Sequence, residues 1–384
     1  MLNQSDALFR EGRFAEADES YTKVLRAESQ NLKALIQRGY IALLSNRLDE
    51  AGALLSRAIE LVPANPIPKA LLAEAFYRQD DFERAAKLFG ELGRKAMQRK
   101  LESFHGQRPY KLEGGKATHL KFVRTDPLPV VKIRVNGSEP VNFLIDIGGA
   151  ELIVDSQFAE EIGIEEFGYE PVTEELQLGH GRVERLELSD FVVRNVPVHI
   201  LDIRQFSETV FGGLRVDGVI GTVFLYHFLA TLDYPRGELI LRPHTEEARP
   251  QGAIVVPFWM AGDHFIVAWG TVSKSRPMLF LVDTGLAGKA FMAPESTLKE
   301  VGIVPDESKA TEGVTIYGKV KEIPFAIDEL TLGEARECEL EGVMGSFRVE
   351  NKFGFPIKGL ISHQFFRNYA LTLDFKGMRL FLVR

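Results

Sequence analysis

Two aspartates occupy positions that suit acid–base chemistry. Asp146 directly follows the apolar run 141–145 (VNFLI), and Asp283 directly follows the apolar run 278–282 (MLFLV). A run this apolar predicts a buried strand, so each strand would deliver one carboxylate into the protein interior. Two carboxylates held close together in a desolvated site cannot both ionise cheaply, so they share a proton and their two pKa values separate. One can then act as a base and the other as an acid.

The surroundings of the two aspartates are duplicated. Residues 129–164 run from PVVKIRVNG through VNFLIDIGGA to AEEIGI, and residues 265–303 repeat this plan through PMLFLVDTG to LKEVGI. Each copy also closes alike, with DGVIGTVFL followed by ATLDYPRGELIL in the first and KGLISHQFF followed by ALTLDFKGMRLFL in the second. The duplication predicts two similar halves that each carry one aspartate.

This order of elements resembles the retropepsin-like aspartic proteases. The resemblance covers roughly residues 127–243 and 253–384, and it implies a mainly-β, two-lobed fold with pseudo-two-fold symmetry within one chain. It also implies that Asp146 and Asp283 form a catalytic pair that activates a water molecule for peptide hydrolysis. The residues that it assigns to the support of the two active-site loops are Ile147, Gly148, Thr284 and Gly285.

The sequence departs from the family pattern at two positions. Ile147 stands where the family has Thr or Ser, whose hydroxyl bonds across to the opposite loop, and Ser362 stands where the first copy has Gly221. Loss of one hydrogen bond costs about 0.5–1.5 kcal/mol, which a fold tolerates, whereas a loosened carboxylate pair costs more in rate. The fold expectation is therefore firmer than the expectation of activity.

Two segments are predicted as hairpins that cover a bound peptide. Residues 176–186 and 314–320 each place glycine between polar and apolar residues, as hairpin tips do. A peptide gripped beneath them would lie extended, with pockets for alternate side chains. The candidate tip residues are Gly179, His180 and Gly181 in the first segment and Tyr317 and Gly318 in the second.

The first 104 residues are predicted to form helical repeats. Phe14, Leu48 and Phe82 recur every 34 positions, and alanines 17, 51 and 85 share the same spacing. This period and its turn-then-helix phrases resemble the tetratricopeptide repeat. Such repeats serve as docking surfaces or spacers, so a protein partner on the helical repeats is expected.

The composition changes character near residue 105, and this change sets the expected domain boundaries. Ala, Leu, Glu and Arg dominate before it, and Val, Ile, Phe and Gly dominate after it. We expect an all-α repeat domain over 1–104, a linker over 105–126, a first lobe over 127–243, an interlobe linker over 244–252 and a second lobe over 253–384.

Composition also excludes other classes of function. The net charge of -8 argues against nucleic-acid binding. With one cysteine and no paired histidine ligand spacing, no metal or other cofactor is expected. No apolar run reaches the roughly eighteen residues of a membrane span. The compartment stays open: cytoplasmic if Met1 is the native start, and periplasmic or secreted if a signal peptide was removed.

Two functions remain open at this point. The first is an aspartic endopeptidase whose repeats recruit a protein substrate. The second is a catalytically impaired relative that binds peptides or acts as a scaffold.

Overall fold

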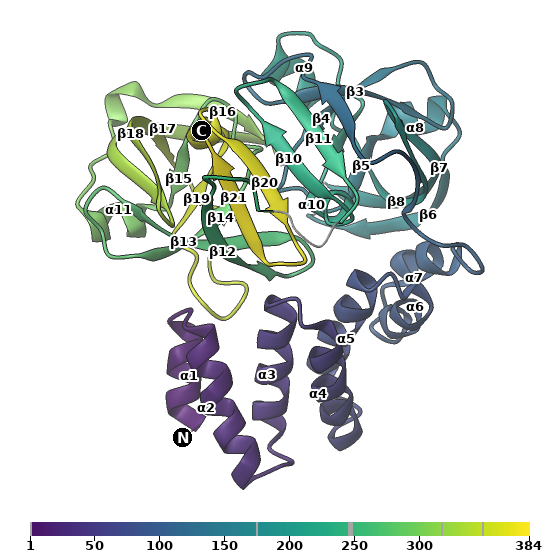
Figure 1. The fold of residues 1–384 in the computed structure, drawn as a ribbon, viewed down its shortest axis with the longest axis vertical. Helices are drawn as coiled ribbons and strands as arrows, with labels where there is room; N and C mark the ends of the chain where they lie inside the picture. The colour runs from purple at the N-terminus through teal and green to yellow at the C-terminus, as the bar shows by residue number, and fades with distance from the viewer. Residues whose placement is uncertain (1, 174–175, 245–248, 316–317, 348) are drawn as a thin grey trace.

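The computed structural model describes residues 2–173, 176–244, 249–315, 318–347 and 349–384. Helices form one end of the molecule, and two β-rich bodies lie side by side across the other (Figure 1). The predicted class, helical repeats followed by a mainly-β region, is confirmed. In the described part of the chain, none of the helices combines the length and the apolar character needed to cross a membrane.

The helical end consists of antiparallel helix pairs. Ala17, Ala51 and Ala85 are fully buried, which allows neighbouring helices to approach closely. Asn31, Asn65 and Asp81 begin helices by accepting hydrogen bonds from backbone N–H groups that the helix leaves unpaired. The helices are α1 (Leu2–Arg10), α2 (Phe14–Ala27), α3 (Leu32–Leu44), α4 (Leu48–Leu61), α5 (Pro66–Arg78), α6 (Phe82–Glu91) and α7 (Lys95–Glu102).

The first β-body is built on an 8-stranded sheet of order β1-β8-β5-β9-β4-β3-β7-β6, in which β7 also pairs with β8. Its strands are β1 (Lys111–Gly114), β3 (Val130–Val135), β4 (Val141–Ile145), β5 (Leu152–Asp155), β6 (Glu165–Pro171), β7 (Gln177–Leu188), β8 (Phe191–Leu201) and β9 (Gly218–Ile220). Its helices are α8 (Ser156–Glu161), α9 (Arg204–Phe211) and α10 (Thr222–Leu225).

The second β-body belongs to a 13-stranded sheet of order β16-β17-β18-β15-β19-β14-β13-β12-β21-β20-β10-β11-β2. The strands are β2 (Thr118–Lys121), β10 (Leu229–Asp233), β11 (Glu238–Arg242), β12 (Ile254–Ala261), β13 (Phe265–Val272), β14 (Met278–Val282), β15 (Phe291–Ala293), β16 (Thr311–Thr315), β17 (Gly318–Leu332), β18 (Ala335–Met344), β19 (Gly359–Ile361), β20 (Ala370–Asp374) and β21 (Arg379–Val383). Helices α11 (Glu295–Val301) and α12 (His363–Phe366) and a 3₁₀ turn (Glu307–Lys309) lie between them.

The two β-bodies are joined through their closing hairpins. Strand β10 pairs with β20, so that β2-β11-β10 lies on one side of the join and β20-β21-β12 on the other. Thr231 faces Thr372 across this pair, and their hydroxyl groups lie 2.8 Å apart. The three strands on each side of the join are arranged alike, which is consistent with pseudo-two-fold symmetry. The symmetry itself stays a prediction.

The residues between the helices and the first lobe are more ordered than a linker. The 105–126 stretch was expected to be a connection, but it contributes β1 to one sheet and β2 to the other. Apolar side chains in it, such as Leu120, supply buried surface that a free linker lacks. The expected interlobe linker 244–252 includes residues 245–248, which lie outside the described residues.

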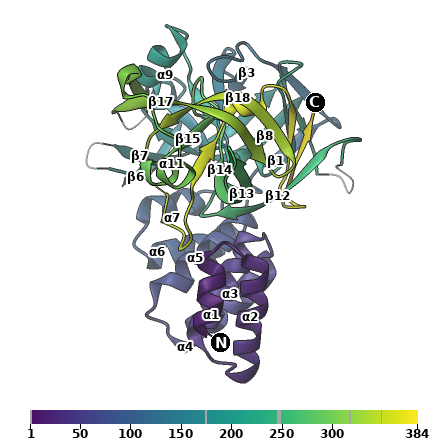
Figure 2. The same cartoon turned by 90° about the vertical axis from the view of Figure 1, so that its left-hand side faces the viewer.

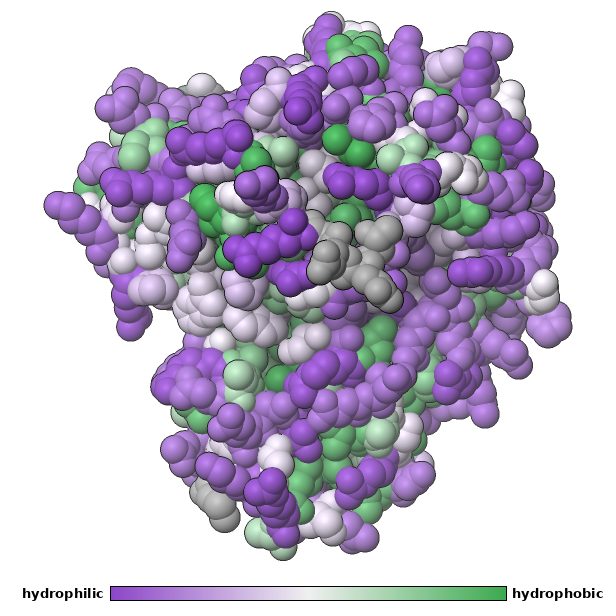
Figure 3. Space-filling model, in the orientation of Figure 1, coloured by the Kyte–Doolittle hydropathy of each residue, from purple (hydrophilic) through white to green (hydrophobic). Residues whose placement is uncertain are grey.

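The helical repeats share their apolar core with both β-bodies. Phe14 packs edge-on against Trp259 and Phe355, with ring centroids 5.2 and 4.9 Å apart, and Phe9 joins the same cluster. At the other end of the array, α7 lies against β6 and β7. The array therefore runs beneath both bodies (Figures 1 and 2). On the face shown in Figure 3, charged and polar side chains cover most of the surface, and apolar ones gather over the helices.

Candidate active site

Strand β4 ends at the first aspartate. It pairs in parallel with β9, and the backbone N–H of Asp146 donates to the carbonyl of Ile220 at 3.1 Å. The Asp146 side chain accepts a hydrogen bond from the N–H of Gly148 at 2.7 Å through Oδ1. The carboxylate is thus fixed at the end of a buried strand, and Asp146 itself is largely buried.

Strand β14 holds the second aspartate in the same way. It pairs in parallel with β19, and the N–H of Asp283 donates to the carbonyl of Ile361 at 3.0 Å. The N–H of Gly285 donates to Asp283 Oδ1 at 2.5 Å. Each aspartate is therefore held by the backbone of its own loop.

The two loops face each other closely enough that each requires glycine. A Cβ on Gly148 would lie 2.5 Å from Cγ of Asp283, and a Cβ on Gly285 would lie 2.6 Å from Cγ of Asp146. No side chain fits at such distances, so glycine leaves the space that the opposite carboxyl group fills. The two carboxyl groups therefore approach each other across this contact, and each affects the ionisation of the other.

One threonine hydroxyl ties the loops together. Thr284 Oγ1 accepts from the N–H of Ile147 at 3.0 Å and donates to the carbonyl of Ile145 at 3.3 Å. The Ile147 side chain is fully buried in the apolar core, so the first loop offers no hydroxyl in return. Instead, Thr222 Oγ1 donates to the Ile147 carbonyl at 2.6 Å from within the same body.

The second departure from the family pattern, Ser362, fits into the structure without displacing its neighbours. Ser362 Oγ accepts a hydrogen bond from the N–H of Leu286 at 3.2 Å, which adds a contact to the Asp283 loop. At Gly221, its counterpart, a Cβ would lie 2.5 Å from the carbonyl oxygen of Ala150. The first loop passes too close for a side chain, whereas the second leaves room for a serine.

The environment of the pair separates two protonation roles. Removal from solvent raises the pKa of both carboxyl groups. The pKa of Asp283 rises further because the negative charge of Asp146 opposes its ionisation. The pKa of Asp146 rises less, because a hydrogen bond from Asp283, the N–H of Gly148 and the charge of His264 favour its ionised form. The pKa of Asp283 is therefore raised further than that of Asp146.

Comparison with known proteins identifies two parts of the chain. Residues 131–224 match the family model described as aspartyl protease, and residues 2–66 and 42–102 match two models described as tetratricopeptide repeat. The chain carries an aspartyl protease domain behind tetratricopeptide repeats. No curated protein matches the chain.

The first predicted hairpin tip of the aspartyl protease domain is wrong. Gly179, His180 and Gly181 lie inside strand β7, paired with β6 on one side and β8 on the other, and His180 is fully buried. The glycines make room for neighbours on one face of the sheet: a Cβ on Gly179 would lie 3.0 Å from Cβ of Ile200, and one on Gly181 would lie 2.9 Å from Cδ1 of Ile200. The β6–β7 turn lies instead at residues 172–176, of which 174–175 are outside the described residues.

The second predicted hairpin lies where the sequence placed it. Strands β16 and β17 form an antiparallel pair whose last register partners are Thr315 and Gly318. Gly318 has φ +105°, a conformation that favours glycine at a turn. Tyr317 lies outside the described residues. The β6–β7 hairpin and the start of β17 extend to the same side of the molecule, left in Figure 2.

Three residues near the site escaped the sequence analysis. Glu151, which follows the Asp146 loop, is buried, and both Lys100 of α7 and the hydroxyl of Tyr77 of α5 donate to its carboxylate. One signal existed in the sequence: Lys100 interrupts the apolar face that α7 otherwise buries, formed by Ala96, Met97 and Leu101. A lysine buried on an apolar helix face needs an acidic side chain as a partner, because an unpaired buried charge is strongly destabilising.

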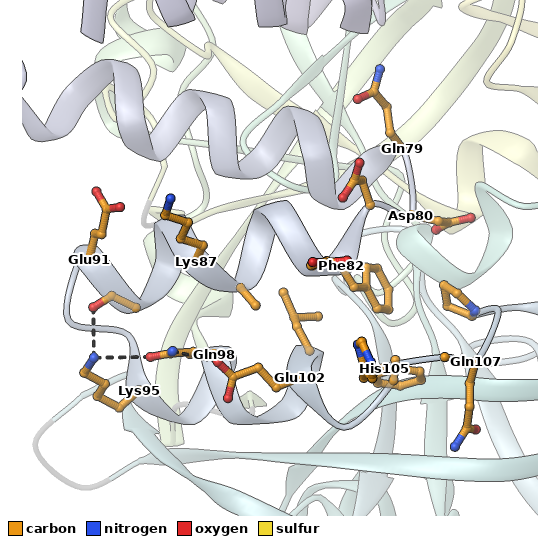
Figure 4. A pocket seen from close by; sticks show the side chains of 18 residues that line it. Gln79, Asp80, Phe82, Lys87, Glu91, Lys95, Gln98, Glu102, His105 and Gln107 are labelled. Atoms are coloured by element: carbon orange, nitrogen blue, oxygen red, sulfur yellow. Dashed lines mark hydrogen bonds between the residues drawn. The ribbon is translucent and has the colours of Figure 1, made fainter. Parts of the chain in front are cut away.

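A groove of about 1050 Å³ opens on the repeats, away from the two aspartates. It lies between α6 and α7 (Figure 4), where Lys95 Nζ donates to the carbonyl of Gly90 at 3.1 Å and to Oε1 of Gln98 at 3.2 Å. Phe82 lines it together with acidic and basic side chains, among them Glu102 and Lys87. Among the residues that the structure describes, no group of three His, Cys, Asp or Glu side chains could hold a metal ion.

Proposed function

We propose that this protein is an aspartic endopeptidase that hydrolyses peptide bonds with a water molecule activated between Asp146 and Asp283. The observation that supports this most strongly is the close contact between the two loops. The carboxyl group of Asp283 fills the space left by Gly148, and the carboxyl group of Asp146 fills the space left by Gly285. A contact of that kind holds two carboxyl groups together in a partly desolvated site, which is what shared-proton chemistry requires. Ile147 and Thr284 complete the support of the two loops.

The direction of the two pKa shifts supports one assignment of catalytic roles. Asp146, the more acidic member, takes a proton from the water as it attacks the carbonyl carbon of the scissile peptide bond. Asp283 donates its proton towards the carbonyl oxygen, where negative charge develops. The tetrahedral intermediate then collapses as Asp146 passes its proton to the leaving nitrogen, and the C–N bond breaks. Asp283 regains its proton from the same intermediate, so neither group is consumed and no covalent intermediate forms.

The substrate in this proposal is an extended polypeptide. Leu176 and Leu178 of the β6–β7 hairpin pack on an apolar cluster that contains Val219, and Ala287 of the Asp283 loop joins the same cluster. Apolar surface beside the pair favours apolar substrate side chains. The repeats would recruit the protein substrate or a partner, and the groove between α6 and α7 is the candidate docking place.

Cleavage of a diverse peptide library by the full-length chain tests the proposal. The wild type should release products, whereas Asp283→Asn, which keeps the size of the side chain but cannot supply the acid, should release none. Equal cleavage by both would show that the activity belongs to something other than this pair.

A second function is favoured by one observation, the missing hydroxyl at Ile147. With only Thr284 bonding across the loops, the protein could be a catalytically impaired relative that binds peptides or serves as a scaffold. That function predicts peptide binding by the wild type without turnover, and binding of similar strength by Asp283→Asn.

A further inference from the structure

A buried ionic cluster joins the repeats to the Asp146 loop. Lys100 Nζ donates to Oε1 and Oε2 of Glu151 at 2.8 and 2.7 Å, and the Tyr77 hydroxyl donates to Oε1 as well. Lys100 is 0% exposed and Glu151 is 2% exposed. Burial alone would raise the pKa of Glu151, but His199 and Lys100 outweigh it and lower the pKa to about 2. The carboxylate is therefore ionised, and it depends on partners from the helices.

Glu151 continues directly from the active-site loop. The segment that links it to Asp146 is fastened to the start of α10: the N–H of Thr222 donates to the Gly149 carbonyl at 2.9 Å, and the N–H of Val223 donates to the Ala150 carbonyl at 2.8 Å. Thr222 in turn bonds the Ile147 carbonyl. Glu151 and Asp146 are thus the two ends of one short stretch that α10 holds by hydrogen bonds.

The end of the same helix α5 also holds the second body. Arg78, the residue after Tyr77, donates to the carbonyls of Met260 at 3.2 Å and of Gly262, at the turn between β12 and β13. That turn leads into β13, where Ile266 pairs with Val282, the residue before Asp283. Two consecutive residues of one helix therefore bind elements next to the aspartate pair from both sides.

We propose that α5 and α7 are part of the active-site framework, with Tyr77 and Lys100 as positioning residues that set the Asp146 loop through Glu151. This rests on the proposed function for its catalytic meaning. The repeats are then more than a docking module, since the geometry of the pair depends on them. A buried ion pair is a costly way to hold two domains together, because apolar residues of similar volume would hold them as well. Because this ion pair lies beside the Asp146 loop, it positions that loop in addition to joining the two domains.

The test compares three full-length variants with the wild type. The triple variant Tyr77→Phe/Lys100→Met/Glu151→Met replaces the cluster with apolar side chains of similar volume, which leaves no unpaired buried charge. Tyr77→Phe alone removes one hydrogen bond and keeps the ion pair. Arg94→Met is the matched control, because it breaks the ion pair of 2.7 Å between Arg94 Nη2 and Glu170 Oε2 across the same junction, away from the Asp146 loop.

Three readouts separate positioning from mere stability: kcat and KM on a cleaved peptide, the thermal midpoint, and the ¹³C NMR titration of the two aspartate carboxyl groups. The triple variant should keep a wild-type midpoint, lose about tenfold or more in kcat with KM nearly unchanged, and shift the titration of Asp146. Tyr77→Phe should lose about threefold in kcat, a smaller misplacement of the same kind. Arg94→Met should match the wild type in kcat and in the titration.

Wild-type kcat and titration in a folded triple variant would overturn the proposal, because the cluster would then be only packing. If the triple variant does not fold, Tyr77→Phe decides in the same way. If the wild type cleaves no peptide, the endopeptidase proposal fails separately, and the aspartate titration still decides whether the cluster positions the loop.

Discussion

Gly148→Ala is the sharpest test of the geometry of the aspartate pair. The added Cβ would lie 2.5 Å from Cγ of Asp283 and 2.7 Å from its Oδ1. An ordinary van der Waals contact needs roughly 3.4 Å or more, so one carboxyl group must retreat by about 1 Å. A displacement of about 1 Å in a catalytic group can cost about 100-fold in rate. We therefore expect kcat to fall by about two orders of magnitude.

The neighbouring glycine provides the control. A Cβ on Gly149 would meet nothing nearer than the Asp146 carbonyl oxygen at 3.2 Å, with Val219 Cγ1 at 3.7 Å, so Gly149→Ala changes the same loop without touching the opposite carboxyl group. Both variants should be assayed for kcat on a cleaved peptide and for the separation of the two carboxyl pKa values by NMR. The titration is informative even without turnover, because a widened pair should titrate more like two independent aspartates.

The reasoning would be refuted if Gly148→Ala kept both its kcat and its coupled titration within about threefold of Gly149→Ala, well short of the expected loss. Such a result would mean that the loops have room to spare, and that glycine is present for another reason.

Three further predictions concern the same loops. Thr284→Val should destabilise the fold by about 1–3 kcal/mol in denaturant unfolding, because it leaves the buried groups that the hydroxyl bonds without a partner, whereas Thr284→Ser should stay near wild type. Ile147→Thr should lower the unfolding free energy by roughly 1–3 kcal/mol without raising turnover, because its hydroxyl enters a fully buried apolar position; an increase in turnover would show that the missing hydroxyl limits catalysis. Because the folded-state pKa of Asp283 is raised, its protonation stabilises the fold at low pH, and this stability is lost as the pH rises through that pKa. Asp283→Asn should therefore be more stable than the wild type at pH 7, and the difference should vanish below about pH 4, where the unfolded carboxyl group is protonated as well.

The sequence predicted those features that local patterns record. The 34-residue period located the helices, and the two apolar runs located the strands that carry Asp146 and Asp283. Both are visible because each depends on residues close together in the chain. The Gly318 turn was found for the same reason.

Features that depend on distant neighbours were missed or misassigned. In the sequence, Gly179 and Gly181 fit a turn as well as a closely packed strand, because glycine suits both. Only their contact with Ile200 in the folded protein shows that they lie in a closely packed strand. The bond from Lys100 to Glu151 joins segments 51 residues apart, and no local pattern pairs them. Likewise, the amino-acid composition does not show that the repeats and the β-bodies share one core. For this reason the sequence of residues 105–126 resembles that of a free linker.

The place of β20 and β21 in the sheet has a consequence for how the protein is made. These strands lie between β10 and β12, in the middle of the sheet that joins the two bodies, yet they follow every other described element in the chain. A ribosome releases the chain from its N-terminal side, so the body with Asp146 can fold while β20 is still untranslated. Until β20 emerges to pair with β10, nothing in this sheet fastens Asp283 opposite its partner. The sheet that joins the two bodies therefore closes late in synthesis, because β10 is translated long before β20, the strand with which it pairs across the join.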